Sequence, residues 1–311
     1  MANYSNPITL VMSRIYHRPK LALDFATRLL RPSFLDQGLR SGLFLSGPRR
    51  TGKTTFLRQD LIPAMENAGA LVVYVDLWSD VSADPKTLIH SALRSALEGL
   101  QPSSGHMPSG LQRRGSEEGG VPIGATIAQI ATEIVDEAKT DLVFIIDEVQ
   151  HMLSSGPSLA ILQALKAARD AVNSSPNTCG HFIFVGAGSH PAHVAGMVTQ
   201  DKNAFAGATA LDYPSLGEDY VQFVLQTMQQ ADLKVIPSLP VASQSFALLG
   251  RRPEELLRAL RVLQQYRPQD ADRYLPVIAA TLQETAADLE INKIRELGTL
   301  ACAVFDRVAR A

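Results

Sequence analysis

A short stretch near position 50 combines glycines, hydroxyls and cations in an order suited to binding phosphate. It matches the pattern G-x-x-x-x-G-K-[ST] in full, through Gly47, Pro48, Arg49, Arg50, Thr51, Gly52, Lys53 and Thr54. An apolar run precedes it and a helical pattern follows, which is the context that this motif requires. Glycines let backbone N–H groups approach phosphate oxygens, and the start of a helix adds partial positive charge. The stretch therefore predicts a phosphate-binding loop, the Walker A motif, with Thr55 completing the predicted binding residues.

Two side chains of the loop have specific predicted tasks. Lys53 is a cation for the β- and γ-phosphates of a nucleotide, and the hydroxyl of Thr54 is a ligand for Mg²⁺. The sequence thus predicts a nucleotide as the ligand of this loop.

A second motif supplies acidic partners. The apolar stretch LVFIIDEVQ (142–150) ends a predicted strand at Asp147, which fits the Walker B carboxylate that holds Mg²⁺. Glu148 follows directly and is predicted to orient an attacking water. Gln150 and His151 are interpreted as helix-face residues rather than catalytic ones.

Apolar runs and helical periodicity alternate through the first two thirds of the chain. Near-continuous apolar runs at 42–46, 70–76, 141–147 and 181–188, with a weaker run at 208–213, predict strands of a buried parallel sheet. Helical patterns occupy 54–66, 86–100 and 158–172. We therefore expect a three-layer α/β phosphate-loop domain over residues 1–214. Residues 101–124, rich in Gly, Ser and Pro, are expected to form a flexible insertion.

After residue 214 every periodic segment is helical. Residues 215–311 are therefore expected to form an all-helical C-terminal domain, which we interpret as a lid. Overall composition adds few constraints. The 311 residues carry 29 Lys and Arg against 31 Asp and Glu, which does not favour a dedicated nucleic-acid binder. The two cysteines have no metal-binding spacing, and no apolar stretch is long enough to span a bilayer, so a cytoplasmic protein is expected.

Four segments together resemble the AAA+ ATPases and, among them, the archaeal-type (STAND-related) P-loop ATPases. They are GPRRTGKTTFL (47–57), VVYVDL (72–77), VFIIDEVQ (143–150) and IFVGAGSH (183–190). The resemblance implies ATP as the nucleotide and Mg²⁺ as its metal. It also implies that Ser189, or else its neighbour His190, senses the γ-phosphate. Arg251 or Arg252, in LLGRRPEELLRAL (248–260), is implied to contact the nucleotide at a helix junction.

The sequence departs from this family at one functional position. Ring-forming members supply an arginine finger from a stretch that corresponds to 198–214, but that stretch contains no arginine here, and Lys202 is its only cation. Because such an arginine contributes strongly to the rate, fast turnover is in question. Arg49 and Arg50 are expected to face solvent or a neighbouring subunit.

These features predict a Mg²⁺-dependent ATPase in which hydrolysis changes conformation and acts on a protein client or a second copy. One alternative is an ATP-dependent switch or scaffold with little turnover. Another is a DNA-associated initiator or transposition-type ATPase, so nucleic-acid binding stays open. A kinase of the same phosphate-loop class is a further alternative.

Overall fold

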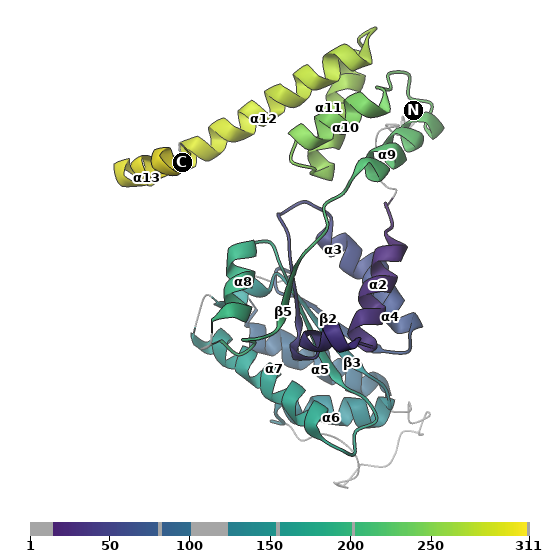
Figure 1. Ribbon diagram of the computed structural model, residues 1–311, viewed down its shortest axis with the longest axis vertical. Coiled ribbons are helices and arrows are strands. Elements are labelled where there is room, and N and C mark those ends of the chain that lie inside the picture. Colours follow the sequence, from purple (N-terminus) through teal and green to yellow (C-terminus); the bar gives the residue numbers. More distant parts are fainter. Residues whose placement is uncertain (1–14, 80–82, 101–123, 154–155, 201–202, 310–311) are drawn as a thin grey trace, which may run out of the picture. The chain divides into compact units, whose positions relative to one another are not determined.

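The computed structural model of the protein describes residues 15–79, 83–100, 124–153, 156–200 and 203–309 (Figure 1). The chain divides into two compact units. One consists of His17–Arg49 and Lys53–Pro214, and the other contains Ser215–Ala311. The first is called the α/β unit below, and the second is called the helical unit.

A five-stranded parallel sheet forms the centre of the α/β unit. Its strands are β1 (Leu43–Ser46), β2 (Leu71–Asp76), β3 (Leu142–Asp147), β4 (Phe182–Gly188) and β5 (Thr209–Asp212), in the spatial order β2-β3-β4-β1-β5. All five predicted strands and their parallel arrangement are confirmed. The register pairs Asp76 with Asp147, and Asp147 with Ala187. The carboxyl ends of β2, β3 and β4 therefore meet at one edge of the sheet.

Alternate residues of the central strands pack on opposite faces of the sheet. Phe44, Phe144 and Phe184 belong to one buried cluster, whereas Leu45 and Ile145 belong to the other. The first cluster includes residues of α5 (Pro85–Leu100), α6 (Ile127–Ala138), α7 (Gly156–Ser174) and α8 (Pro191–Thr199). Burial on both faces explains why these strands read as continuous apolar runs.

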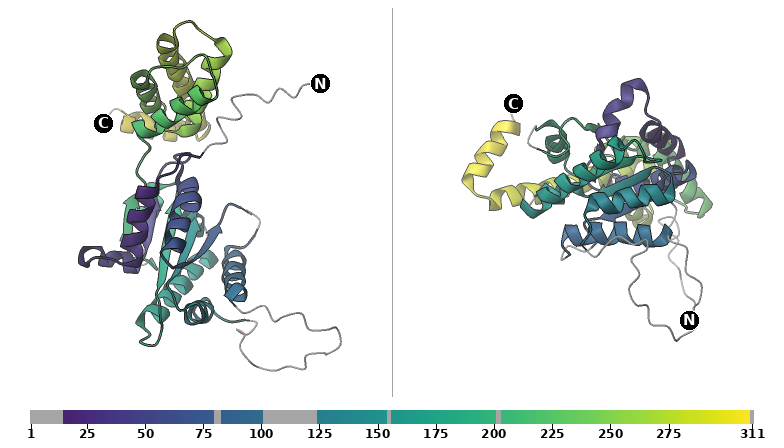
Figure 2. Two further views of the ribbon diagram at one scale, coloured as in Figure 1. Left: turned by 90° about the vertical axis from the view of Figure 1, so that its right-hand side faces the viewer. Right: turned by 90° about the horizontal axis from the view of Figure 1, so that it is seen from below.

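The second cluster includes α2 (Pro19–Leu30) and a helical run that follows the phosphate loop. This run comprises α3 (Lys53–Phe56), a π turn η2 (Leu57–Leu61) and α4 (Ile62–Asn67), which continue one another without a break. Figure 2 shows α2, in purple, and α5, in blue, on opposite sides of the sheet. The predicted three-layer α/β fold is thus confirmed.

Three helices of this unit were not expected from periodicity: α2, α6 and α8. Proline is the first residue of α2 and α8, and a capping box joins Thr126 and Gln129 at the start of α6. Two 3₁₀ segments, η1 (Phe34–Ser41) and η3 (Val149–Leu153), complete the unit. Most of the predicted insertion, residues 101–123, lies outside the described residues.

The helical unit has a buried core of its own. Its helices are α9 (Glu218–Gln230), α10 (Leu239–Leu248), α11 (Pro253–Tyr266), α12 (Ala271–Glu296) and α13 (Thr299–Ala309). Val221, Phe246, Leu256 and Leu275 pack together in that core. The expectation of a helical C-terminal part is confirmed. Among the helices that the structure describes, none is both long and apolar enough to cross a membrane.

Candidate nucleotide-binding site

The loop between β1 and α3 has a backbone shaped by two residues with positive φ. The N–H of Gly47 donates to the carbonyl of Gly188 at 3.2 Å, which ties the start of the loop to the end of β4. Gly52 has φ +89° and Arg50 has φ +66°. Glycine adopts this conformation freely, whereas a side chain disfavours it. The motif predicts the turn at Gly52 but gives no sign of the left-handed backbone at Arg50.

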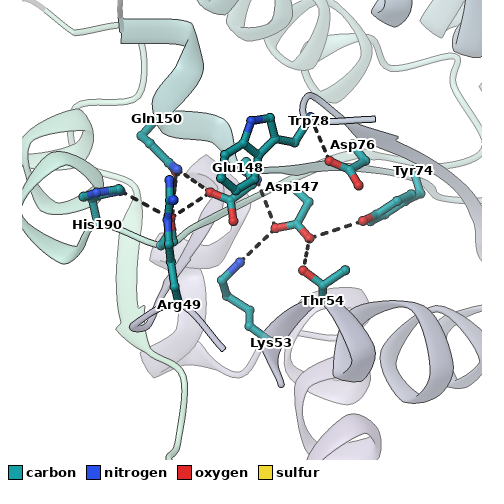
Figure 3. Close-up of polar contacts among 11 residues, drawn as sticks. Arg49, Lys53, Thr54, Tyr74, Asp76, Trp78, Asp147, Glu148, Gln150 and His190 are labelled. Carbon is teal, nitrogen blue, oxygen red and sulfur yellow. Dashed lines mark hydrogen bonds and ion pairs between the residues drawn. The ribbon is translucent and has the colours of Figure 1, made fainter. Parts of the chain in front are cut away.

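Asp147, at the end of β3, accepts four hydrogen bonds (Figure 3). Its Oδ1 accepts hydrogen bonds from the Nζ of Lys53 at 2.9 Å and from the backbone N–H of Glu148 at 3.0 Å. Its Oδ2 accepts hydrogen bonds from the hydroxyl of Thr54 at 2.6 Å and from the hydroxyl of Tyr74 at 3.2 Å. The structure therefore brings together the predicted phosphate cation, the predicted metal hydroxyl and the predicted metal carboxylate.

The ion pair between Lys53 and Asp147 is almost fully buried, with side chains 5% and 1% exposed. Two buried charges are stable there because each has the other as a partner and the carboxylate is fully hydrogen-bonded. A phosphate group entering the loop would offer Lys53 a second anionic partner.

The oxygen atoms of Thr54 and Asp147 suit Mg²⁺, which prefers hard oxygen ligands. Among the residues that the structure describes, no group of three or more His, Cys, Asp or Glu side chains is placed to hold a metal. A Mg²⁺ ion at this position would thus take its other ligands from substrate phosphates and water, as it does in many phosphate-transfer sites. The donor set therefore fits the metal that the motif implies.

Tyr74, on β2, is a site residue that the sequence did not reveal. Burial raises the pKa of its phenol well above the usual range, and the negative charges of Asp147 and Asp76 raise it further. The phenol therefore stays protonated and donates its hydrogen to Asp147. Tyr74 lies two residues before the end of β2. That position places it beside Asp147 only because β2 and β3 are neighbouring strands, which the sequence does not reveal.

Glu148 has a left-handed backbone, with φ +57°. Its Oε2 accepts hydrogen bonds from the amide of Gln150 and from the hydroxyl of Ser189, the latter at 2.8 Å. Gln150 and Ser189 are themselves buried, at 8% and 6% exposed. The interpretation of Gln150 as a helix-face residue missed this contact, because η3 is a short 3₁₀ turn that directs Gln150 inward.

Arg49 and Trp78 complete the cluster. The guanidinium carbon of Arg49 lies 4.4 Å from the ring centroid of Trp78, and its Nε donates to the Ser189 hydroxyl at 3.3 Å. Arg49 is exposed, as expected of an outward-facing residue, but its guanidinium rests on the site rather than pointing away from it. Trp78 was missed, and the only signal was an aromatic residue just after the β2 run.

The other predicted site residues lie outside the cluster around Asp147. In the helical unit, α10 ends at Leu248 and α11 begins at Pro253, as the helix-junction pattern predicts. Arg251 has φ +53° and its Nη1 donates to the carbonyl of Leu216 at 3.3 Å, while Arg252 directly precedes α11. Nucleotide contacts stay predictions for every residue of the phosphate loop, Pro48, Thr51 and Thr55 included, and for Arg251 and Arg252. Lys202 lies outside the described residues.

Comparisons with known proteins agree with this geometry. Residues 37–190 match the family model of an AAA domain. No curated protein matches the chain. Among solved structures, the chain is similar to the ORC2 protein of Aeropyrum pernix in its ADP form, with 16% identity, a TM-score of 0.54, and coverage of 87% of this chain and 72% of that one.

The ORC2 structure described with ADPNP and ADP is similarly related, at 15% identity and a TM-score of 0.52, covering 87% of this chain and 71% of that one. A Walker-type ATPase of Pyrococcus abyssi has 17% identity and a TM-score of 0.49, covering 93% and 79%. The family model thus identifies residues 37–190, just under half of the chain, as an AAA domain, and the fold shared with ORC2 agrees with that assignment.

Proposed function

We propose that the protein binds ATP with Mg²⁺ and hydrolyses it. The observation that carries the proposal is the buried cluster in which Asp147 holds both Lys53 and Thr54, with Glu148 as its immediate neighbour. ATP, rather than another nucleotide, is favoured by the family and by the complexes of the similar ORC2 protein with ADPNP and ADP, which are both adenine nucleotides.

Each residue of the cluster would contribute a separate part of the reaction. Lys53 would bind the β- and γ-phosphates, and Thr54 and Asp147 would hold Mg²⁺, which neutralises charge on the phosphates when bound. Glu148 would orient a water whose oxygen attacks the γ-phosphorus and would accept a proton from it. The bond between the γ-phosphorus and the bridging oxygen breaks, so the products are ADP, inorganic phosphate and a proton.

Ser189 is proposed to contact the γ-phosphate, because its buried hydroxyl lies at the end of β4 beside Glu148. We further propose that hydrolysis changes the conformation of the chain and acts on a protein client or a second copy. Two free cysteines, Cys179 and Cys302, fit a reducing compartment such as the cytoplasm.

Phosphate release tests the proposal. The wild-type protein with ATP and Mg²⁺ should release phosphate, and Glu148→Gln should lower kcat by about 10²-fold or more while retaining ATP affinity, since it removes the proton acceptor. Lys53→Ala should instead abolish measurable ATP binding by calorimetry. Arg273→Ala, in the helical unit, is the control and should behave as wild type. Equal and negligible rates for wild type and Glu148→Gln would overturn the hydrolysis proposal.

A second candidate function is an ATP-dependent switch with slow turnover. The contact that favours it is the pair of hydrogen bonds from Gln150 and Ser189 to Glu148, because a carboxylate engaged in this way is less available to a water. Tight binding of ATP by a wild-type protein that releases almost no phosphate would support the switch.

A further inference from the structure

We propose that Arg49 is an arginine finger supplied by the chain to its own nucleotide. This inference rests on the proposed hydrolysis and assigns to the phosphate loop a task that ring-forming relatives give to a neighbouring subunit. The stretch at 198–214, where such relatives carry the finger, has no arginine in this sequence.

The first support is the position of the guanidinium. Its Nε reaches the Ser189 hydroxyl at 3.3 Å, and that hydroxyl donates to Glu148 at 2.8 Å. A single hydroxyl thus separates the guanidinium from the carboxylate that would orient the attacking water. Figure 3 shows Arg49 directed toward Glu148 and Gln150, while Lys53 approaches Asp147 from another side.

The second support is the donor capacity that Arg49 leaves unused. A guanidinium has five N–H donors in a planar fork. Within the described part of the chain, Arg49 makes no ion pair, and its two terminal nitrogens have no hydrogen-bond acceptor. A cation with free donors at the edge of a nucleotide loop suits the charge that develops on the phosphoryl oxygens during transfer.

The third support is the platform under the guanidinium. The Trp78 ring lies 4.4 Å from the guanidinium carbon, and the backbone N–H of Trp78 donates to Asp76 at 2.8 Å. Stacking on an aromatic face restricts a flexible arginine before any ligand arrives. Trp78 is therefore a positioning residue for Arg49, and Arg49 itself is the residue that touches the substrate.

The main experiment measures kcat and affinity separately in the full-length chain. Arg49→Ala should lower kcat by about 10³-fold, in line with arginine fingers elsewhere, and change ATP affinity by less than about tenfold. Arg49→Lys should also lose most of the rate, because an ammonium lacks the planar fork. Arg273→Ala removes another arginine that stacks on an aromatic ring, at 5.9 Å from Tyr274, and should keep the wild-type rate.

A binding measurement gives a readout that does not depend on turnover. Calorimetry compares affinity for ADP with aluminium fluoride, a mimic of the transferring phosphoryl group, against affinity for ADP alone. Wild type should bind the mimic more tightly, and Arg49→Ala should reduce that preference by about 10²-fold without weakening ADP binding. Trp78→Ala should reduce it partly, and Trp78→Phe should restore it.

A mixing experiment establishes whether the arginine acts within its own chain. Arg49→Ala and Glu148→Gln each lack one part of the machinery, and an equimolar mixture should stay inactive because neither chain holds both. Recovery of activity would mean that the arginine acts across an interface and would overturn the inference, as would a wild-type kcat in Arg49→Ala. If wild type and Glu148→Gln are equally inactive, the proposed hydrolysis itself fails, which is a different result.

Discussion

At the scale of single residues, the buried pair of Lys53 and Asp147 is the most sensitive contact of the site. Both side chains are almost completely shielded from water, and Asp147 is the common acceptor of four donors. A buried charge is stable only while its oppositely charged partner is present. Removing one partner therefore costs more stability than replacing both with apolar groups.

Asp147→Ala should lower the free energy of unfolding of the nucleotide-free protein by about 3–5 kcal/mol, because Lys53 is left as an unpaired buried cation. Urea unfolding followed by circular dichroism measures the loss. The double variant Lys53→Met with Asp147→Leu is the control and should be clearly more stable than the single one. A loss below about 1 kcal/mol for Asp147→Ala would show that Lys53 finds water or another partner.

At the scale of elements, the close approach of β3 and β4 depends on a glycine just before the second strand. A Cβ at Gly180 would lie 2.2 Å from the carbonyl oxygen of Thr140, which precedes β3. The pairing of the two strands starts two residues later, at Leu142 and Phe182. These strands carry Asp147 and lead into Ser189, so their spacing affects the site.

Gly180→Ala should destabilise the protein by about 1–3 kcal/mol, because the clash is with backbone and one strand must shift. Gly99→Ala is the matched control. A Cβ at Gly99 has no neighbour within 4 Å, and the residue is the last but one of α5, so the substitution should be neutral or stabilise by less than about 0.5 kcal/mol. Thermal unfolding of both variants tests the pair, and equal effects would contradict the assigned cause.

Some site residues and elements were predictable from the sequence, and others became apparent only in the fold. Lys53, Thr54 and Asp147 were predictable because each lies within a short motif whose spacing has a chemical reason. Tyr74 and Gln150 were not, since their roles depend on strand register and on the direction of one 3₁₀ turn. The five strands were predictable from burial on both faces, whereas α2, α6 and α8 were not expected.

At the scale of the whole molecule, the α/β unit and the helical unit have separate hydrophobic cores. Chains with separate cores often unfold in more than one step. Leu165 is fully buried in the first unit, and Leu260 is 3% exposed in the second, which gives one probe for each.

Calorimetry of the wild type should show two unfolding transitions. Leu165→Ala should lower the free energy of unfolding of the α/β unit by about 2–5 kcal/mol. Leu260→Ala should lower that of the helical unit by a similar amount. A non-hydrolysable ATP analogue with Mg²⁺ at a hundred times its Kd should stabilise the α/β transition by about 2.7 kcal/mol. A single transition that both variants lower equally would show that the two cores unfold together.

The contact between Arg49 and Trp78 also bears on the intrinsic tryptophan fluorescence of the protein. Trp78 is the single tryptophan of the chain and is 44% exposed, so its emission comes from one known place. The guanidinium lies 4.4 Å from the centre of the indole ring, so a nucleotide that draws the arginine away is expected to change that emission. Stopped-flow fluorescence of the unlabelled protein is therefore expected to follow changes around this indole as nucleotide arrives and leaves.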